Sequence, residues 1–222
     1  MLLALDTSTT QVGLAIYDGT RIIGEVFWHG RKHHTVDVPP ALADLFKRTG
    51  VMINDIQALG VALGPGSFTS LRAGLALAKG LALARRCPLI GINTFDILAA
   101  AMPVSDRRLA TILQAGRGRL AIGWYTSAGE EWQTEGPAGV TTIDKLVNNI
   151  RRPTLVCGEL TAGERQRLAR KYKNVILASP AQSVRRPGIL AELAWQKWQT
   201  GRFEPAASLS PIYLHVAGAP RA

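Results

Sequence analysis

The first hundred residues alternate between short apolar runs and stretches with apolar residues at helical spacing. "MLLALDTST" is an apolar run that ends in a polar turn, and "QVGLAIYDGTRIIGEVFWHG" contains two β-rich segments joined through Asp18-Gly19, a typical hairpin signal. Apolar spacing predicts a helix over 36–49. The pattern then predicts the strand "IQALGVALG", a helix over 67–86, the strand "PLIGIN" and a helix over 94–102 capped by Asn93 or Thr94.

The segment "MPVSDRR" at 102–108 is a plausible boundary, after which the pattern starts again. Further elements are expected as strands near 108–114, 119–126 and 154–157 and as helices near 141–150, 161–171 and 186–200. Strands that alternate with helices indicate an α/β architecture with some parallel pairing. We therefore predict two lobes, 1–102 and 103–222, with the last helix as a candidate for packing back on the first lobe.

Charge is distributed unevenly along the 222 residues. The formal net charge is +10, and residues 101–222 contribute +8 of it, from 17 basic and 9 acidic side chains. This surplus favours an anionic partner such as RNA, but arginines scattered on solvated helices explain it equally well. Aromatic residues are thinly spread, so the sequence shows no base-stacking platform. We expect any RNA binding by the isolated chain to be weak and mainly electrostatic.

Cysteine, histidine and apolar content argue against several classes of protein. Cys87 and Cys157 form no CxxC pair, so neither a disulfide framework nor a zinc site is predicted. The adjacent pair His33-His34 lacks further ligands at a useful spacing, and no metal site is expected there. No leader is evident, and no uninterrupted apolar stretch reaches the roughly 20 residues that cross a bilayer. These features predict a cytoplasmic protein without a membrane segment.

Two short motifs could approach a phosphate. Asp6-Thr7-Ser8 lies at the end of the first strand and resembles the first phosphate loop of actin-like ATPases. In that loop a carboxylate positions metal-bound water. Gly66 and Ser67 open the helix over 67–86, where backbone N–H groups could face an anion. A polar turn and a tight strand-to-helix turn capped by Ser67 account for the same residues. The second loop also lacks a Walker lysine.

The helix over 67–86 is apolar almost all the way round. One stripe holds Leu71, Leu75, Ala78 and Ala82, and a second holds Ala73, Leu77, Gly80 and Ala84. A helix that is apolar on all sides is expected to be buried on both sides. Either it is sandwiched within its own chain, or one stripe is covered by another protein. The apolar pattern by itself leaves both alternatives open.

Four segments resemble the TsaB (YeaZ) family in order and spacing: "LALDTSTTQVGLAIYD", "HTVDVPPALADLF", "GPGSFTSLRAGLALAKGLAL" and "PLIGINTFDILA". The match is continuous over 1–100 and rests chiefly on "GPGSFT" with Arg72. It is looser in the second half, where "GRGRLAIGWY" and "PIYLH" stand at the family's positions. Ser70 and Gly116 replace a usual glycine and aspartate, and His215 a usual arginine.

The resemblance implies an actin-like fold of the ribonuclease H-like (ASKHA) class, with mixed sheets flanked by helices. It also implies a non-catalytic subunit of the machinery that makes N6-threonylcarbamoyladenosine in tRNA. Such a subunit pairs with the catalytic paralogue TsaD, acts with the ATPase TsaE, and forms a homodimer without TsaD. It meets tRNA through the complex. No tightly bound cofactor is implied, and ATP or ADP would bind only at the interface of the complex.

The resemblance also assigns particular residues. TsaD-like enzymes hold a metal with two histidines where this chain has Thr94 and Leu98, so metal chemistry is expected to be absent here. The resemblance places the partner interface on the helix over 67–86 and the helix before it, and we therefore predict that the stripe with Leu75 and Ala78 faces outward. The expected interface residues are Leu42, Leu45, Phe46, Leu71, Leu75, Ala78, Lys79 and Ala82. Two alternatives remain, an active ATP-dependent enzyme of the actin-like superfamily and a metallopeptidase related to TsaD.

Overall fold

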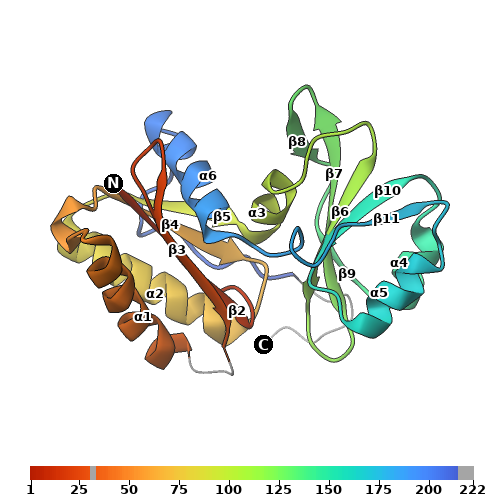
Figure 1. Cartoon of the computed structure of the whole chain (residues 1–222), viewed down its shortest axis with the longest axis horizontal. Coiled ribbons are helices and arrows are strands. Elements are labelled where there is room, and N and C mark those ends of the chain that lie inside the picture. Colours follow the sequence, from red (N-terminus) through yellow and green to blue (C-terminus); the bar gives the residue numbers. More distant parts are fainter. Residues whose placement is uncertain (31–33, 215–222) are drawn as a thin grey trace. The chain divides into compact units, whose positions relative to one another are not determined.

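The computed structural model describes residues 1–30 and 34–214, with residues 34 and 35 described through their backbone alone. His33, the side chain of His34 and His215 thus lie outside the described part. Contacts divide the described chain into two units, Met1–Ile97 with Arg185–Ile212, and Leu98–Val184 with Tyr213 and Leu214 (Figure 1). The first unit thus ends at Ile97, close to the predicted boundary at 102, and it takes in the segment Arg185–Ile212, which contains the last helix.

A five-stranded sheet with the order β3-β2-β1-β4-β5 forms the centre of the first unit. Its strands are β1 (Leu2–Asp6), β2 (Gln11–Tyr17), β3 (Ile22–His29), β4 (Ala58–Gly64) and β5 (Leu89–Asn93). The strands β1 to β3 pair antiparallel through the predicted hairpin, whereas β4 pairs parallel with both β1 and β5. The sheet is therefore mixed, as the resemblance implied.

Helices cover both faces of this sheet. α1 (His34–Thr49) and α2 (Phe68–Arg85) pack on the face that carries Leu3 and Leu5 of β1, and α6 (Pro187–Gln199) packs on the face that carries Leu2 and Ala4. Alternate residues of a strand point to opposite faces, so a continuous apolar run serves both layers. Two short helices, η1 (Ile53–Asp55) and α3 (Thr94–Ala100), precede β4 and follow β5.

Small residues allow α6 to approach the sheet closely. A Cβ atom added at Gly60 of β4 would lie 2.6 Å from Cβ of Ala194 on α6, which is closer than such atoms come. Leu190, Ala191 and Ala194 of α6 are fully buried. The last helix thus completes the core of the first unit.

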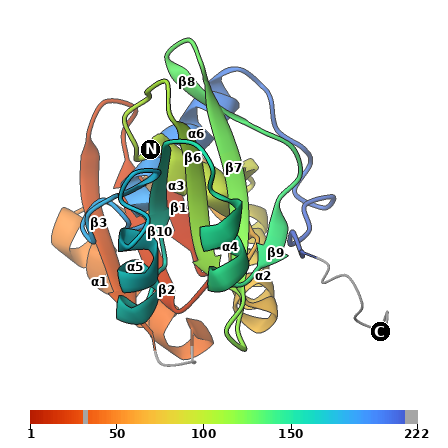
Figure 2. The ribbon, with the colours of Figure 1, turned by 90° about the vertical axis from the view of Figure 1, so that its right-hand side faces the viewer.

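The second unit has its own mixed sheet, with the order β11-β10-β6-β7-β8 and β9 paired to β7. Its strands are β6 (Arg108–Gln114), β7 (Leu120–Ala128), β8 (Glu131–Thr134), β9 (Gly139–Thr141), β10 (Thr154–Gly158) and β11 (Val175–Leu177). α4 (Ile143–Asn149) and α5 (Ala162–Ala169) pack together on one face of this sheet (Figure 2). Across the described ranges, no helix has the length and apolar character that a bilayer span requires.

Both cysteines are free thiols in different surroundings. Burial raises the pKa of the Cys157 thiol to about 12, and burial also raises the pKa of the half-exposed Cys87 thiol. Because the thiolate is the reactive form, we expect a thiol reagent at about pH 8 to modify native Cys87 much faster than Cys157. Unfolding in denaturant should make the two rates similar. Equal rates in the native chain would contradict this description of the core.

Candidate functional site

The turn after β1 holds a buried cluster of polar side chains. Asp6, Ser8 and Thr9 are each at most 5% exposed. Oδ1 of Asp6 accepts hydrogen bonds from the Ser8 backbone N–H at 2.8 Å and from its hydroxyl at 2.6 Å. The carboxylate thus closes a local turn of the kind that aspartate favours after a strand. The residues of the candidate phosphate loop thus form the polar turn that was predicted as the alternative.

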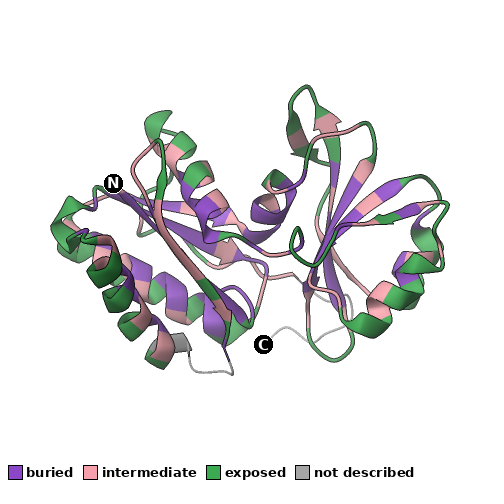
Figure 3. Cartoon of the chain, in the orientation of Figure 1, coloured by how far each residue is buried: buried purple, intermediate pink, exposed green. Residues whose placement is uncertain are grey.

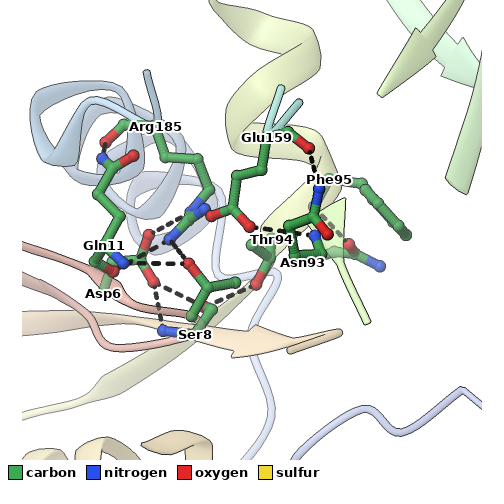
Figure 4. Close-up of polar contacts among 10 residues, drawn as sticks. Asp6, Ser8, Gln11, Asn93, Thr94, Phe95, Glu159 and Arg185 are labelled. Atoms are coloured by element: carbon green, nitrogen blue, oxygen red, sulfur yellow. Dashed lines mark hydrogen bonds and ion pairs between the residues drawn. The ribbon is translucent and has the colours of Figure 1, made fainter. Parts of the chain in front are cut away.

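The second oxygen of Asp6 is bound by Arg185, which comes from the segment before α6 (Figure 4). Nε of Arg185 donates to Oδ2 of Asp6 at 2.8 Å, and Nη2 donates to Oγ1 of Thr9 at 2.8 Å and to the Gln11 carbonyl at 3.1 Å. Gln11 in turn donates from Nε2 to the Arg185 carbonyl at 2.7 Å. The Arg185 side chain is 0% exposed and that of Asp6 is 3% exposed. Burying two charges costs desolvation free energy, and the additional hydrogen bonds of this pair offset that cost.

The glycine loop before α2 packs directly on the same turn. The Ser67 backbone N–H donates to the Ser8 carbonyl at 2.7 Å. A Cβ atom at Gly66 would lie 2.0 Å from that carbonyl oxygen, so only glycine fits. Ser67 occupies the N-cap position of α2 as predicted, but its side chain makes no capping hydrogen bond. The N–H of Ser67 is therefore engaged within the chain.

The first turn of α2 adds further contacts to the cluster. Thr7 donates from its hydroxyl to the Ser70 carbonyl at 2.9 Å. A Cβ atom at Gly74 would lie 1.9 Å from Oγ1 of Thr7, so α2 approaches the turn as closely as glycine permits. Arg72 stacks over the Phe68 ring, 3.9 Å from its centroid. The "GPGSFTSLRAG" segment thus fits the turn after β1 through its backbone.

The start of α3 completes the cluster. Oδ1 of Asn93 accepts from the Phe95 N–H at 2.9 Å, so Asn93 caps the helix. The Thr94 hydroxyl instead lies 2.8 Å from the Ser8 hydroxyl, and Thr94 is 0% exposed. Leu98 is likewise fully buried. Within residues 1–30 and 34–214, no three His, Cys, Asp or Glu side chains come together in a way that could hold a metal ion.

The predicted outward stripe of α2 faces the core of the first unit instead. Leu71, Leu75, Ala78 and Ala82 are 1%, 6%, 0% and 3% exposed. On α1, Leu42 and Leu45 are also buried, while Phe46 packs partly buried against them. Lys79 donates from Nζ to the Ala207 carbonyl at 3.3 Å. The prediction that Leu75 and Ala78 point outward is wrong, because these side chains fill the space between α2 and the sheet.

The outer side of α2 is formed by other residues. Figure 3 shows much of α2 as buried, whereas Thr69, Ala76, Gly80, Leu83 and Ala84 are exposed and Ala73 is partly exposed. We call these six residues the outer face of α2. Leu83 is 81% exposed. Nothing lies within 4 Å of a Cβ atom added at Gly80, although glycine inside a helix costs about 1 kcal/mol relative to alanine.

Sequence reasoning missed Arg185 and Gln11 as members of the cluster. Arg185 stands 179 positions from Asp6 in the chain, and its neighbour Arg186 looks identical in the sequence. The guanidinium of Arg186 pairs instead with the Glu25 carboxylate at the surface of the first unit. Only the return of α6 to the first sheet selects which of the two arginines is buried.

Comparison with known proteins defines the class. The sequence model described as "TsaD: tRNA N6-adenosine threonylcarbamoyltransferase" matches residues 22–182. The tRNA threonylcarbamoyladenosine biosynthesis protein TsaB of Bacillus subtilis is 29% identical over 222 residues, which cover 98% of this chain and 95% of that protein. A tRNA N6-adenosine threonylcarbamoyltransferase of Geobacter sulfurreducens is 27% identical over 177 residues, covering 69% of this chain and 51% of that protein.

A solved structure shows the same fold. YeaZ from Pseudomonas aeruginosa superposes with a TM-score of 0.77 at 24% identity, over 96% of this chain and 99% of that one. The fold is therefore the predicted actin-like α/β fold with mixed sheets flanked by helices. Fold and sequence together define a relative of the threonylcarbamoyltransferases. Within that class, the chain belongs to the TsaB (YeaZ) family, and the resemblance noted in the first hundred residues is confirmed.

Proposed function

We propose that this chain is a non-catalytic subunit of the machinery that forms N6-threonylcarbamoyladenosine in tRNA, and that it binds and activates a TsaD protein. The curated TsaB relatives are named as threonylcarbamoyladenosine biosynthesis proteins. The ATPase TsaE is the expected third component. We also propose a cytoplasmic location, where tRNA is modified.

The observation that carries the non-catalytic role is the occupied carboxylate of Asp6. An actin-like ATPase would need this carboxylate to position metal-bound water. In this chain the guanidinium of Arg185 takes one oxygen of Asp6, and Ser8 takes the other. The N–H of Ser67, a candidate phosphate donor, is bound to the Ser8 carbonyl. This supports a role without ATP turnover, and we place any ATP or ADP binding at the interface with a partner.

The start of α3 supports the same conclusion for transfer chemistry. By the family resemblance, Thr94 and Leu98 stand where TsaD-like enzymes have two metal-binding histidines. A hydroxyl and an isobutyl group cannot replace two imidazoles. Both side chains are buried, and Thr94 is committed to Ser8. The catalytic metal is therefore assigned to the partner.

The outer face of α2 is the surface that we propose for the partner. Most of its side chains are small, Leu83 is its large apolar residue, and the exposed Arg72 lies at its border. Gly80 has no contact within the chain that would require a glycine. Small residues allow the backbone of a second helix to approach closely. A TsaD protein that shares sequence with this chain would present related helices, so one pseudo-symmetric contact could serve a heterodimer or, without TsaD, a homodimer.

Complex formation tests the proposal. The full chain and the TsaD protein of the same organism should elute together as a heterodimer in size-exclusion chromatography with light scattering. The chain alone should elute as a homodimer that TsaD dissociates. Adding TsaE should give a larger complex. Separate elution of all three proteins at micromolar concentration would contradict the proposed partnership.

A further inference from the structure

Three turns of the second unit bring basic side chains to one edge of its sheet. β6, β10 and β11 are parallel neighbours, and at their first residues Thr154 pairs with both Arg108 and Val175 (Figure 1). The segments that enter these strands, 107–108, 151–152 and 170–173, are therefore adjacent. They carry seven basic side chains, and we call them together the basic edge. Their spacing in sequence hides this convergence.

Part of this charge is fixed within the protein, and part faces solvent. Glu135 accepts from Nε of Arg108 at 2.6 Å and from Nη2 of Arg152 at 3.1 Å, and Arg108 also stacks over the Trp124 ring. Arg151 and Lys173, by contrast, are exposed, as are Arg107 and Arg170. Glu135 thus fixes the positions of Arg108 and Arg152, while the other exposed cations of the basic edge can contact an external anion.

An aromatic ring stands among these cations. Tyr172 is 74% exposed and lies between Lys171 and Lys173 in the turn that precedes β11. Cations near the ends of α4 and α5 also complement the negative ends of those helices. That effect accounts for neither the arginines before β6 nor the exposed ring. Basic side chains with an exposed aromatic ring are the usual elements of a surface that binds single-stranded nucleic acid.

We propose that the basic edge is an RNA contact surface, with its cations on phosphates and Tyr172 stacked on an unpaired base. The inference rests on the proposed function for the identity of the RNA, which is then the tRNA to be modified. Adjacent parallel strands are about 4.8 Å apart, so the three segments present their cations close together along one edge. The contact would be direct, in contrast to the expectation that tRNA meets this chain only through the complex.

Fluorescence anisotropy with an unmodified tRNA transcript tests this surface on the full chain. The affinity is measured at several salt concentrations between about 50 mM and about 200 mM. At the lowest salt, the double variant Arg151→Ala/Lys173→Ala should bind about tenfold more weakly than the unchanged chain. The variant should also reduce the slope of log affinity against log salt by about 1.4–1.8, as expected for two lost phosphate contacts. Tyr172→Ala should weaken binding several-fold, whereas Tyr172→Phe should not.

The matched control removes the same charge elsewhere. Lys47→Ala/Arg202→Ala changes two exposed cations of the first unit and should shift affinity less than about twofold. Equal losses in both double variants would overturn the proposal, as would binding to phosphatidylserine vesicles that depends on the edge while tRNA binding does not. A chain that stimulates TsaD normally but shows no edge-dependent tRNA binding would overturn this inference and leave the proposed function intact.

Discussion

Replacing Arg185 by methionine is expected to lower the free energy of unfolding of the chain by about 3–5 kcal/mol, because it leaves the buried carboxylate of Asp6 without its cation. The variant also removes the hydrogen bonds to Thr9 and the Gln11 carbonyl. Urea denaturation followed by circular dichroism measures the change. The same substitution at Arg48, whose pair with Asp44 is exposed, should cause no measurable change.

A second variant identifies the cause of that loss. Combining Asp6→Asn with Arg185→Met removes the uncompensated charge and should restore a large part of the lost stability. If the double variant is as unstable as Arg185→Met, the guanidinium contributes through packing and hydrogen bonds, and the ion pair is unimportant. If Arg185→Met and Arg48→Met have equal stability, the buried cluster described here is wrong.

Two alanines of α2, two positions apart, are expected to respond in opposite ways to glutamate. Ala78 is 0% exposed in the core between α2 and the sheet, so Ala78→Glu buries a carboxylate without a partner. We expect it to cost more than about 4 kcal/mol and to unfold much of the chain at room temperature. Ala76 is exposed on the outer face of α2, so Ala76→Glu should leave the melting temperature nearly unchanged.

Binding to TsaD is the property that we expect Ala76→Glu to change. Ala76→Glu places a charge in the proposed contact, where desolvation without a counter-charge should weaken association more than a hundredfold, equivalent to about 2.7 kcal/mol. Size-exclusion chromatography with TsaD measures the loss on a folded protein. Normal binding by folded Ala76→Glu would remove the outer face of α2 from the interface. A stable, well-folded Ala78→Glu would contradict the packing of α2.

Local patterns predicted most of the first unit. The strand before Asp6, the Asp18-Gly19 hairpin and the helices over 36–49 and 67–86 each follow from apolar spacing and turn residues within a few positions. β8, β9 and β11 were not predicted, since they have only four, three and three residues and each forms by pairing with a longer strand. Their position depends on the sheet that they join.

The burial and the neighbours of the candidate site residues could not be predicted from local sequence patterns. Both stripes of α2 are apolar, so the sequence could not decide which faces the sheet. Side-chain size gave a usable signal in retrospect, because the stripe with Leu71 and Leu75 is the larger and fills the core. Arg185 and the basic edge depend on long-range pairing of α6 and of the parallel strands. No spacing within the sequence reports such contacts.

Threonylcarbamoyl transfer to tRNA, measured with threonylcarbamoyl-adenylate that is labelled in its threonyl group, tests the central claim most directly. The reaction contains threonylcarbamoyl-adenylate, ATP, an unmodified tRNA transcript, and the chain, TsaD and TsaE singly or together. We expect no product from this chain alone, little from TsaD with TsaE, and sustained product formation once the chain joins them. Product formed by the purified chain without TsaD, or an unchanged rate when it is added, would contradict its role as a non-catalytic activating subunit.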